Sequence, residues 1–224
     1  MGFYNVVSPA LPLPPIDYDK SQQDQFQYAL RLYFNRLGES LTQLANTGGG
    51  SFLSFPFIEA SDSGTQYATG NNTATIVNWD TTSFGNQFTL NVGNTATAQR
   101  SGIYKITYSL QFANDANDIH NAVVWLRING STSAADVPNS TTTFTLQARK
   151  SASEPAFVCG YSEVVFALNA GDEVGLWWGT DQAATSGGGT GVYIYSEVAQ
   201  TTPMAYPATP SAIGSITFVS ALTT

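Results

Sequence analysis

The chain has 224 residues, of which 11% are charged and 12% are aromatic, and its formal net charge is −8. This length suits one large domain, or one domain with an extension, and allows a buried core without disulfides. The acidic charge and the few Lys and Arg residues argue against a nucleic-acid partner and against electrostatic docking to a membrane, since both need clustered basic side chains.

The N-terminal segment 1–16 is apolar and rich in proline, which predicts an extended arm. It has no basic stretch followed by a long apolar run, so we expect no signal peptide, and no segment has the roughly 20 apolar residues of a membrane span. Such an arm orders against a partner, and we expect Leu11, Leu13 and Ile16 to anchor it. The single cysteine, Cys159, excludes an internal disulfide and fits synthesis in a reducing cytoplasm.

Residues 17–50 predict an anchoring helix followed by a glycine-rich hinge. Apolar residues recur at intervals of three and four over 17–46, close to a heptad repeat, and TGGG at 47–50 ends the pattern. The positions expected to form the anchoring face are Phe26, Leu30, Tyr33, Leu37 and Leu41. Two interpretations remain open: the helix packs on its own domain, or identical helices associate in parallel.

Residues 51–224 have the pattern of β-structure. In RSGIYKITYSLQF (100–112), apolar and polar residues alternate, which is typical of a strand with one dry face. The expected strands are 52–58, 73–79, 86–92, 102–112, 121–129, 142–148, 157–168, 172–178, 191–198 and 213–221. Short strands with turn signals between them and no intervening helices predict a mainly β fold, a sandwich or jelly roll, after the arm and helix.

Several strands are apolar on both faces. Val123 and Trp125 form a second apolar row in one strand, and Trp177 does so in another. A two-layer sandwich needs only one dry face per strand, so the second row needs a cover. Either a subunit interface or the protein's own long loops can supply this cover.

The single histidine offers the only candidate metal or triad position. His120 follows Asp115 and Asp118 in NDANDIH (114–120), whose side-chain oxygens suit Ca²⁺. The spacing lacks the 12-residue pattern of an EF-hand, and short polar runs between strands are ordinary turns. We therefore expect no metal site here.

Other candidates for catalysis are equally weak. Glu163, Asp172 and Glu173 could form a carboxylate pair of the glycosidase kind, but GDE falls in an expected turn. Cys159, between Val158 and Gly160, is predicted to be a packed core residue. We expect no catalytic residue, no cofactor and no enzymatic activity.

Four stretches carry a resemblance to a known superfamily. GIYKITYSLQF (102–112), VVWLRINGS (123–131), VVFALNAGDEVGLWW (164–178) and GVYIY (191–195) resemble the tumour necrosis factor and complement globular-head superfamily. The resemblance implies a ten-stranded jelly roll that forms a compact homotrimer. We then expect Val123, Trp125, Trp177 and Tyr193 nearest the threefold axis or the subunit seams.

The whole chain also resembles a family of marine bacteriophage structural proteins. Its proline-rich arm, the helix ALRLYFNRL (29–37), and the stretches IHNAVVWLRINGS (119–131) and PATPSAIGSITFVS (207–220) carry this resemblance. It implies a virion component, made in the host bacterial cytoplasm, whose partners are other virion proteins of the capsid or tail.

Two classes of function follow as expectations. The first is architectural: a homotrimeric decoration or cement protein, or a head-fibre component, anchored by its arm and helix. The alternative is a tail or fibre appendage module that recognises a host-surface glycan or protein through exposed aromatic residues such as Trp79, Tyr193 and Tyr195.

Overall fold

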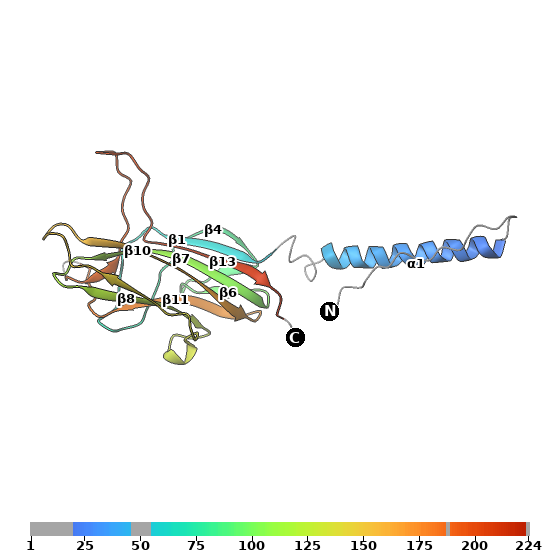
Figure 1. The fold of residues 1–224 in the computed structure, drawn as a ribbon, viewed down its shortest axis with the longest axis horizontal. Helices are drawn as coiled ribbons and strands as arrows, with labels where there is room; N and C mark the ends of the chain where they lie inside the picture. The colour runs from blue at the N-terminus through green and yellow to red at the C-terminus, as the bar shows by residue number, and fades with distance from the viewer. Residues whose placement is uncertain (1–19, 46–54, 187–188, 223–224) are drawn as a thin grey trace. The chain divides into compact units, whose positions relative to one another are not determined.

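The computed structural model describes residues 20–45, 55–186 and 189–222. The chain divides into two compact units, one ending at Phe55 and the other beginning at Pro56 (Figure 1). The predicted arm at 1–16 and the predicted hinge at 47–50 lie outside the described residues, so Leu11, Leu13 and Ile16 remain predictions.

The first unit contains the helix α1, Lys20–Ala45, which confirms the single helix predicted ahead of the β-structure. Good helix formers such as Ala29, Leu30 and Arg31 occupy its middle. No helix in the described part of the chain is long and apolar enough to cross a membrane.

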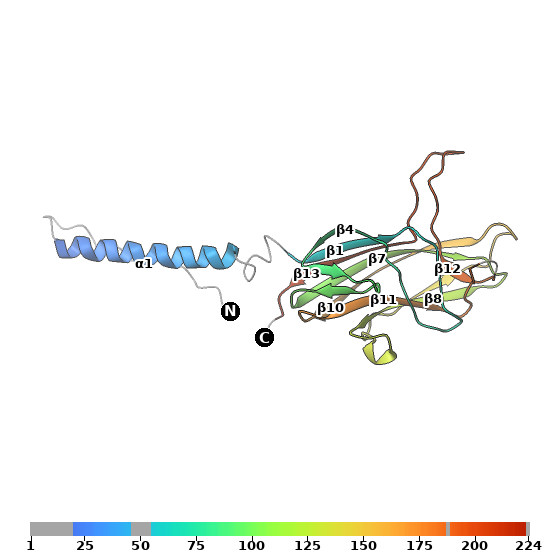
Figure 2. The ribbon, with the colours of Figure 1, turned by 180° about the vertical axis from the view of Figure 1, so that it is seen from behind.

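The second unit is a sandwich of two antiparallel sheets, which confirms the mainly β fold (Figures 1 and 2). Sheet I has the order β2 (Gln66–Tyr67), β12 (Val192–Ile194), β7 (Gly102–Asn114), β13 (Ala212–Ser220), β1 (Phe57–Asp62) and β4 (Thr81–Asn86), with β10 (Ala156–Leu168) paired along β7. Sheet II has the order β5 (Phe88–Leu90), β6 (Ala96–Ala98), β11 (Glu173–Thr180), β8 (His120–Ile128) and β9 (Thr142–Leu146), with β3 (Thr75–Ile76) paired to β11.

The core lies between the two sheets. In β7 every second residue is buried, and the buried set includes Tyr104, Tyr108 and Phe112. Trp178 and Leu126 approach from sheet II, and the Trp178 ring lies 5.9 Å from the Phe112 ring. The alternation read from the sequence thus fixes which face of sheet I is inside.

The short strands differ most from the sequence-based expectation. The strand expected at 52–58 begins outside the described residues, and its end overlaps β1, Phe57–Asp62. Strands β2, β4 and β6 were not predicted. These segments are polar or only two to six residues long, and β4 reads TTSFGN. Pairing with longer neighbours, rather than local pattern, makes them strands.

Candidate functional site

The outward face of sheet I is unusually apolar. Exposed large apolar side chains occur on four of its strands: Tyr67 on β2, Phe84 on β4, Phe157, Tyr161 and Val165 on β10, and Ile213 and Val219 on β13. By contrast, no strand of sheet II carries an exposed large apolar side chain among the described residues. Polar outward residues of β7, such as Lys105, Thr107 and Ser109, separate the apolar side chains of β10 from those of β13 and β4. The difference between the two sheets still makes sheet I, rather than sheet II, the candidate contact surface.

Four of the rings on this face form a continuous line, here called the aromatic row: Phe157, Tyr195, Tyr193 and Tyr67. The Phe157 and Tyr195 centroids are 5.2 Å apart, those of Tyr195 and Tyr193 are 6.3 Å apart, and Tyr193 stacks on Tyr67 at 5.7 Å. Burial, and then the nearby charge of Asp115, raise the pKa of Tyr193 to about 12. The phenol therefore stays neutral and offers a ring face rather than an acid or base.

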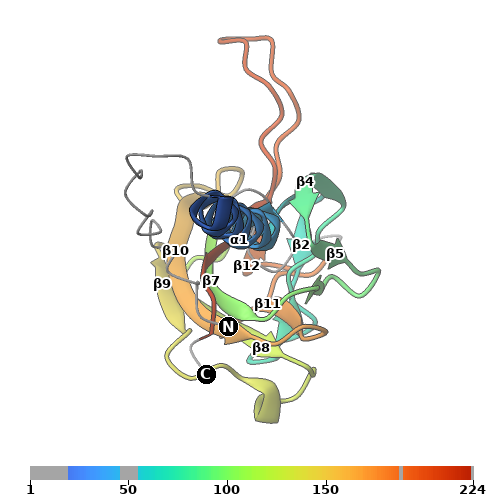
Figure 3. The same ribbon diagram turned by 90° about the vertical axis from the view of Figure 1, so that its right-hand side faces the viewer.

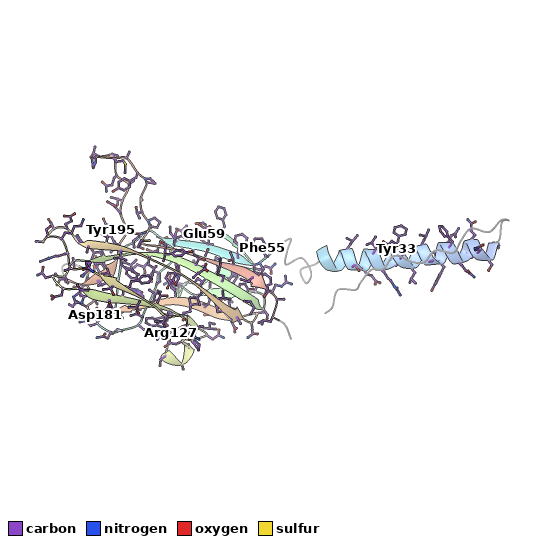
Figure 4. The ribbon with its side chains drawn as sticks, in the orientation of Figure 1. Tyr33, Phe55, Glu59, Arg127, Asp181 and Tyr195 are labelled. Atoms are coloured by element: carbon purple, nitrogen blue, oxygen red, sulfur yellow. The ribbon has the colours of Figure 1, made fainter. Side chains whose placement is uncertain are left out.

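Few charges interrupt this face. Lys105 of β7 forms an ion pair with Glu163 of β10 at 3.4 Å, so these two charges largely cancel. Glu59 of β1 adds a negative charge on the side of the sandwich where Tyr195 lies (Figure 4). Arg127 lies on the opposite side and does not compensate it. With Lys105 and Glu163 paired, Glu59 leaves this face about one net negative charge out of the −8 of the chain, so another acidic molecule can approach here with comparatively little repulsion.

A hairpin between β12 and β13, residues 196–210, is here called the hairpin arm, as distinct from the predicted N-terminal arm at 1–16. It stands away from the sandwich on the side where β1 and β4 lie (Figures 1, 2 and 3). Its two limbs are joined by the pairs Glu197–Thr209 and Gln200–Tyr206. The Tyr206 hydroxyl donates a hydrogen bond to the carboxylate of Glu197, the only charged residue of this hairpin, over 2.9 Å.

The outward apolar row of sheet II is covered by the chain itself. Trp125 and Trp177 lie opposite each other in β8 and β11, and the Arg127 guanidinium lies over both rings, 4.4 Å from the Trp177 centroid. Asp136 holds this arrangement, since it accepts hydrogen bonds from Trp125 Nε1 at 2.8 Å and from Arg127 Nε at 2.6 Å. The protein's own loop after β8 thus supplies the cover that the sequence left open.

The four residues predicted at a trimer seam do not share one surface. Val123, Trp125 and Trp177 are partly buried on sheet II, whereas Tyr193 is in sheet I. A role at a subunit seam stays a prediction for all four, but only Tyr193 belongs to the exposed aromatic face. Trp79, named with the exposed aromatic residues, is partly buried and packs against the core.

The carboxylates singled out from the sequence have structural partners. Asp172 accepts a hydrogen bond from Asn129 Nδ2 at 2.7 Å, and Glu173 accepts one from the Thr95 hydroxyl at 3.1 Å. Glu163 pairs with Lys105. All three carboxylates therefore take part in contacts that connect one strand or turn of the β-unit to another.

His120 sits beside one carboxylate. Its Nδ1 lies 3.4 Å from Asp181 Oδ1, and the same oxygen accepts the Asn121 amide at 2.9 Å. In NDANDIH, Asn114 and Asp115 bond to backbone groups, including the Gly191 amide. Within residues 20–45, 55–186 and 189–222, no group of three or more His, Cys, Asp or Glu side chains could hold a metal ion.

Between the sheets, an apolar cavity of about 30 Å³ is lined by residues such as Ile58, Trp79 and Leu176. This volume corresponds to roughly one water molecule, too little for an organic ligand.

The prediction that Cys159 packs in the core was wrong. Its neighbours Val158 and Gly160 face inward, and so Cys159 faces outward on β10, where it is exposed. Its sulfur lies 3.2 Å from the Ser109 hydroxyl of β7. The thiol therefore belongs to the outward face of sheet I, between Phe157 and Tyr161 along the strand.

The predicted anchoring residues of α1 share one side of the helix. Phe26 and Leu41 are 38% and 55% exposed, and Leu30, Tyr33 and Leu37 are partly exposed. Figure 4 marks Tyr33, whose ring contacts that of Phe34 edge-on at 5.6 Å. These residues form an apolar stripe along α1, and Tyr28, Leu32 and Phe34 are further exposed apolar side chains of the same helix.

Comparisons with models of known protein families and with curated protein sequences find no match for this chain.

Proposed function

We propose that the chain is a non-enzymatic structural protein of a bacteriophage particle, a homotrimeric decoration or cement protein or a head-fibre component. In this proposal the N-terminal arm and α1 attach it to capsid or tail proteins, and the β-unit supplies the trimer. Its location is then the virion, and its partners are copies of itself and neighbouring virion proteins.

The observation that carries this proposal is the apolar stripe on α1. The helix belongs to a separate unit from the sandwich, and Phe26 and Leu41 remain substantially exposed. An isolated amphipathic helix gains little stability from its own sequence and is stabilised mainly when its apolar stripe is buried. Attachment to a larger assembly would provide that burial.

The sheet topology supports the trimeric jelly roll that the proposal assumes. Along the chain, β7 lies in sheet I, β8 and β9 in sheet II, β10 in sheet I, β11 in sheet II and β13 in sheet I. Repeated crossing between two sheets is how a jelly roll is wound. The apolar outward face of sheet I gives such a domain a surface for other copies.

Particle incorporation tests the proposal. We expect deletion of residues 1–46 to leave a folded β-unit that no longer joins the phage particle, and we expect residues 1–50 fused to an unrelated trimer to be incorporated. Protein composition of purified particles, measured by mass spectrometry, gives the occupancy. Normal occupancy of the truncated chain would show that attachment lies in the β-unit.

Point variants of the full chain make this test sharper. Leu30→Asp with Leu37→Asp places two charges on the apolar stripe, and we expect at least a tenfold loss of occupancy. Asn35→Asp with Thr42→Asp adds the same charges on the opposite side of the helix and serves as the matched control. Equal losses for both pairs would point to a general charge effect and contradict the proposal.

The aromatic row favours one second candidate, recognition of a host-surface glycan by a tail or fibre appendage. Tyr67 is exposed at the surface, and its ring stacks on that of the partly buried Tyr193. Sugars stack on exposed aromatic rings of this kind. Binding of host-derived polysaccharide to the full chain, abolished by Tyr67→Ala, would support this candidate over the architectural one.

A further inference from the structure

The hairpin arm, residues 196–210, has few interactions that could stabilise its conformation by itself. Its two limbs share only two bridging pairs, and its apolar residues Val198 and Met204 are 75% and 68% exposed. A two-stranded hairpin with no packed face is at best marginally stable in water. Something must therefore cover the arm in the working protein.

The chain itself offers a matching surface. Phe157 and Tyr161 are 53% and 59% exposed, so each presents on the order of 100 Å² of apolar area. Together with the other exposed large apolar side chains of sheet I, and without counting the arm, the apolar area of the face is on the order of 500 Å². A standard interface buries about 800 Å² per partner, polar rim included, so this surface is of the size a second copy needs.

Charge also favours a second copy as the occupant. The chain carries a net charge of −8, so two copies repel each other over most of their surface. The arm has one charged residue, Glu197, and it is bonded to Tyr206. On sheet I, Lys105 and Glu163 neutralise each other. Glu197 keeps its negative charge, and Glu59 of β1 adds one on the face, so each surface carries about one net negative charge. Copies that meet here experience much less repulsion than the net charge of −8 would give elsewhere.

We propose that the hairpin arm (196–210) of one copy lies across the outward face of sheet I of the next copy, against the aromatic row. This inference rests on the proposed homotrimer and names the surface that builds it. The arm and the face are different surfaces, so the contact is heterologous and closes into a ring when each copy donates one arm and receives one.

The oligomeric state of the full chain tests this contact. Val198→Asp with Met204→Asp alters the arm, Tyr161→Asp with Val165→Asp alters the face, and Val92→Asp with Ile119→Asp is the matched control on exposed loops elsewhere. All six side chains are exposed, so folding should survive. Analytical ultracentrifugation measures the protein concentration at which half of the oligomer has dissociated. We expect the double substitutions in the arm and in the face to raise this concentration at least tenfold, and the control pair to leave it unchanged.

Cys159 reports on the face directly. Its thiol is exposed in the single chain and lies beside Phe157 and Tyr161. In the assembled protein we expect an aromatic disulfide reagent to label it at least tenfold more slowly than in the arm and face variants. The labelling is repeated with Leu30→Asp and Leu37→Asp present, so that association through α1 does not hide the loss of the contact.

The outcomes separate this inference from the proposed function. An oligomer whose Cys159 reacts freely, or that ignores the arm and face pairs, overturns this contact but leaves the homotrimer standing. A monomer at micromolar concentration overturns both the contact and the homotrimer, while attachment through α1 is judged by particle incorporation. Protection of Cys159 only after addition of polysaccharide overturns the contact in favour of recognition.

Discussion

Asn129 and Asp172, 43 residues apart in the chain, join two turns of the β-unit through a hydrogen bond of 2.7 Å. Asn129 also accepts the Glu173 amide through its side chain at 2.8 Å, and its backbone has the left-handed conformation, with φ of 57°. Asparagine is one of the few residues other than glycine that adopts this conformation readily. The turn that holds Asp172 was predicted from the sequence, but its hydrogen bond to Asn129 was not.

We expect Asn129→Ala to lower the free energy of unfolding by about 2–3 kcal/mol, because it removes two side-chain hydrogen bonds and strains the backbone. Asn129→Gly should restore part of this loss. Asn139→Gly is the control, since Asn139 has a similar φ of 63°. Urea unfolding followed by tryptophan fluorescence measures all three. Equal stability of wild type and Asn129→Ala would show that the hydrogen bonds of Asn129 with Asp172 and Glu173 contribute little.

The hydrogen bond between Asn129 and Asp172 also predicts that the stability of the protein depends on pH. Burial acts to raise the pKa of Asp172, but hydrogen bonds from Asn129 and Asn169 outweigh it and lower the pKa below the ordinary value of 3.8. The carboxylate therefore contributes stability above about pH 3.8, and this contribution is lost as the pH falls through the lowered pKa. Asp172→Asn should be less stable than wild type at pH 6, and the difference should shrink below pH 3.8. Thermal unfolding across this range measures it, and a difference independent of pH would contradict the assignment.

The arginine between the two tryptophans predicts a stability loss on conservative replacement. Lysine cannot lie flat on the Trp177 ring and also bond Asp136 and the Ser131 carbonyl, as Arg127 does. We expect Arg127→Lys to lower the free energy of unfolding by about 1–3 kcal/mol. Arg149→Lys is the control: Arg149 is partly exposed and its Nε donates a hydrogen bond to Asn117 Oδ1, so we expect a loss of under about 1 kcal/mol. Equal effects of the two changes would contradict this account.

A close approach of strand and ring predicts an effect at Gly214. A Cβ added there would lie 2.7 Å from Cη2 of Trp79, which packs against the core. Gly214→Ala should therefore lower the free energy of unfolding by about 1–3 kcal/mol through overpacking. Gly93→Ala meets no atom within 4 Å and is the matched control. Guanidinium unfolding curves compare the two, and a neutral Gly214→Ala would show that Trp79 moves freely.

Metal removal should not affect the protein. The described residues contain no metal-binding cluster, and the polar run around His120 is bonded to backbone groups. We expect a chelator to leave the thermal midpoint unchanged and His120→Ala to lower stability by under about 1 kcal/mol. A chelator-induced drop of several degrees in calorimetry would establish an ion site instead.

The sequence predicted the long strands well because burial of one face imposes a period of two, as in β7. It also predicted that Trp125 and Trp177 need a cover, but the choice of Arg127 and Asp136 depends on where the loop after β8 returns. Cys159 was misplaced for a related reason. Strand β10 is apolar at inward Val158 and at outward neighbours alike, so local hydrophobicity could not indicate the inner face.

The hairpin arm at 196–210 had no detectable signal in the sequence. Its prolines and threonines are typical of loops, and only the absence of packing around Val198 and Met204 distinguishes it from an ordinary turn. The outward apolar face was equally hidden, since its members come from strands that are distant in sequence and adjacent only after pairing.

The position of β13 determines when the β-unit can fold. This strand follows all others in the chain, yet it lies between β7 and β1 in the middle of sheet I, where Phe57 pairs with Thr217. During synthesis β1 and β4 can pair with each other, but they cannot join β7 until residues 212–220 leave the ribosome. Such non-local pairing makes folding slow, and the open edge of β7 is prone to aggregation during the delay. Slower, cooler expression should therefore raise the yield of native protein.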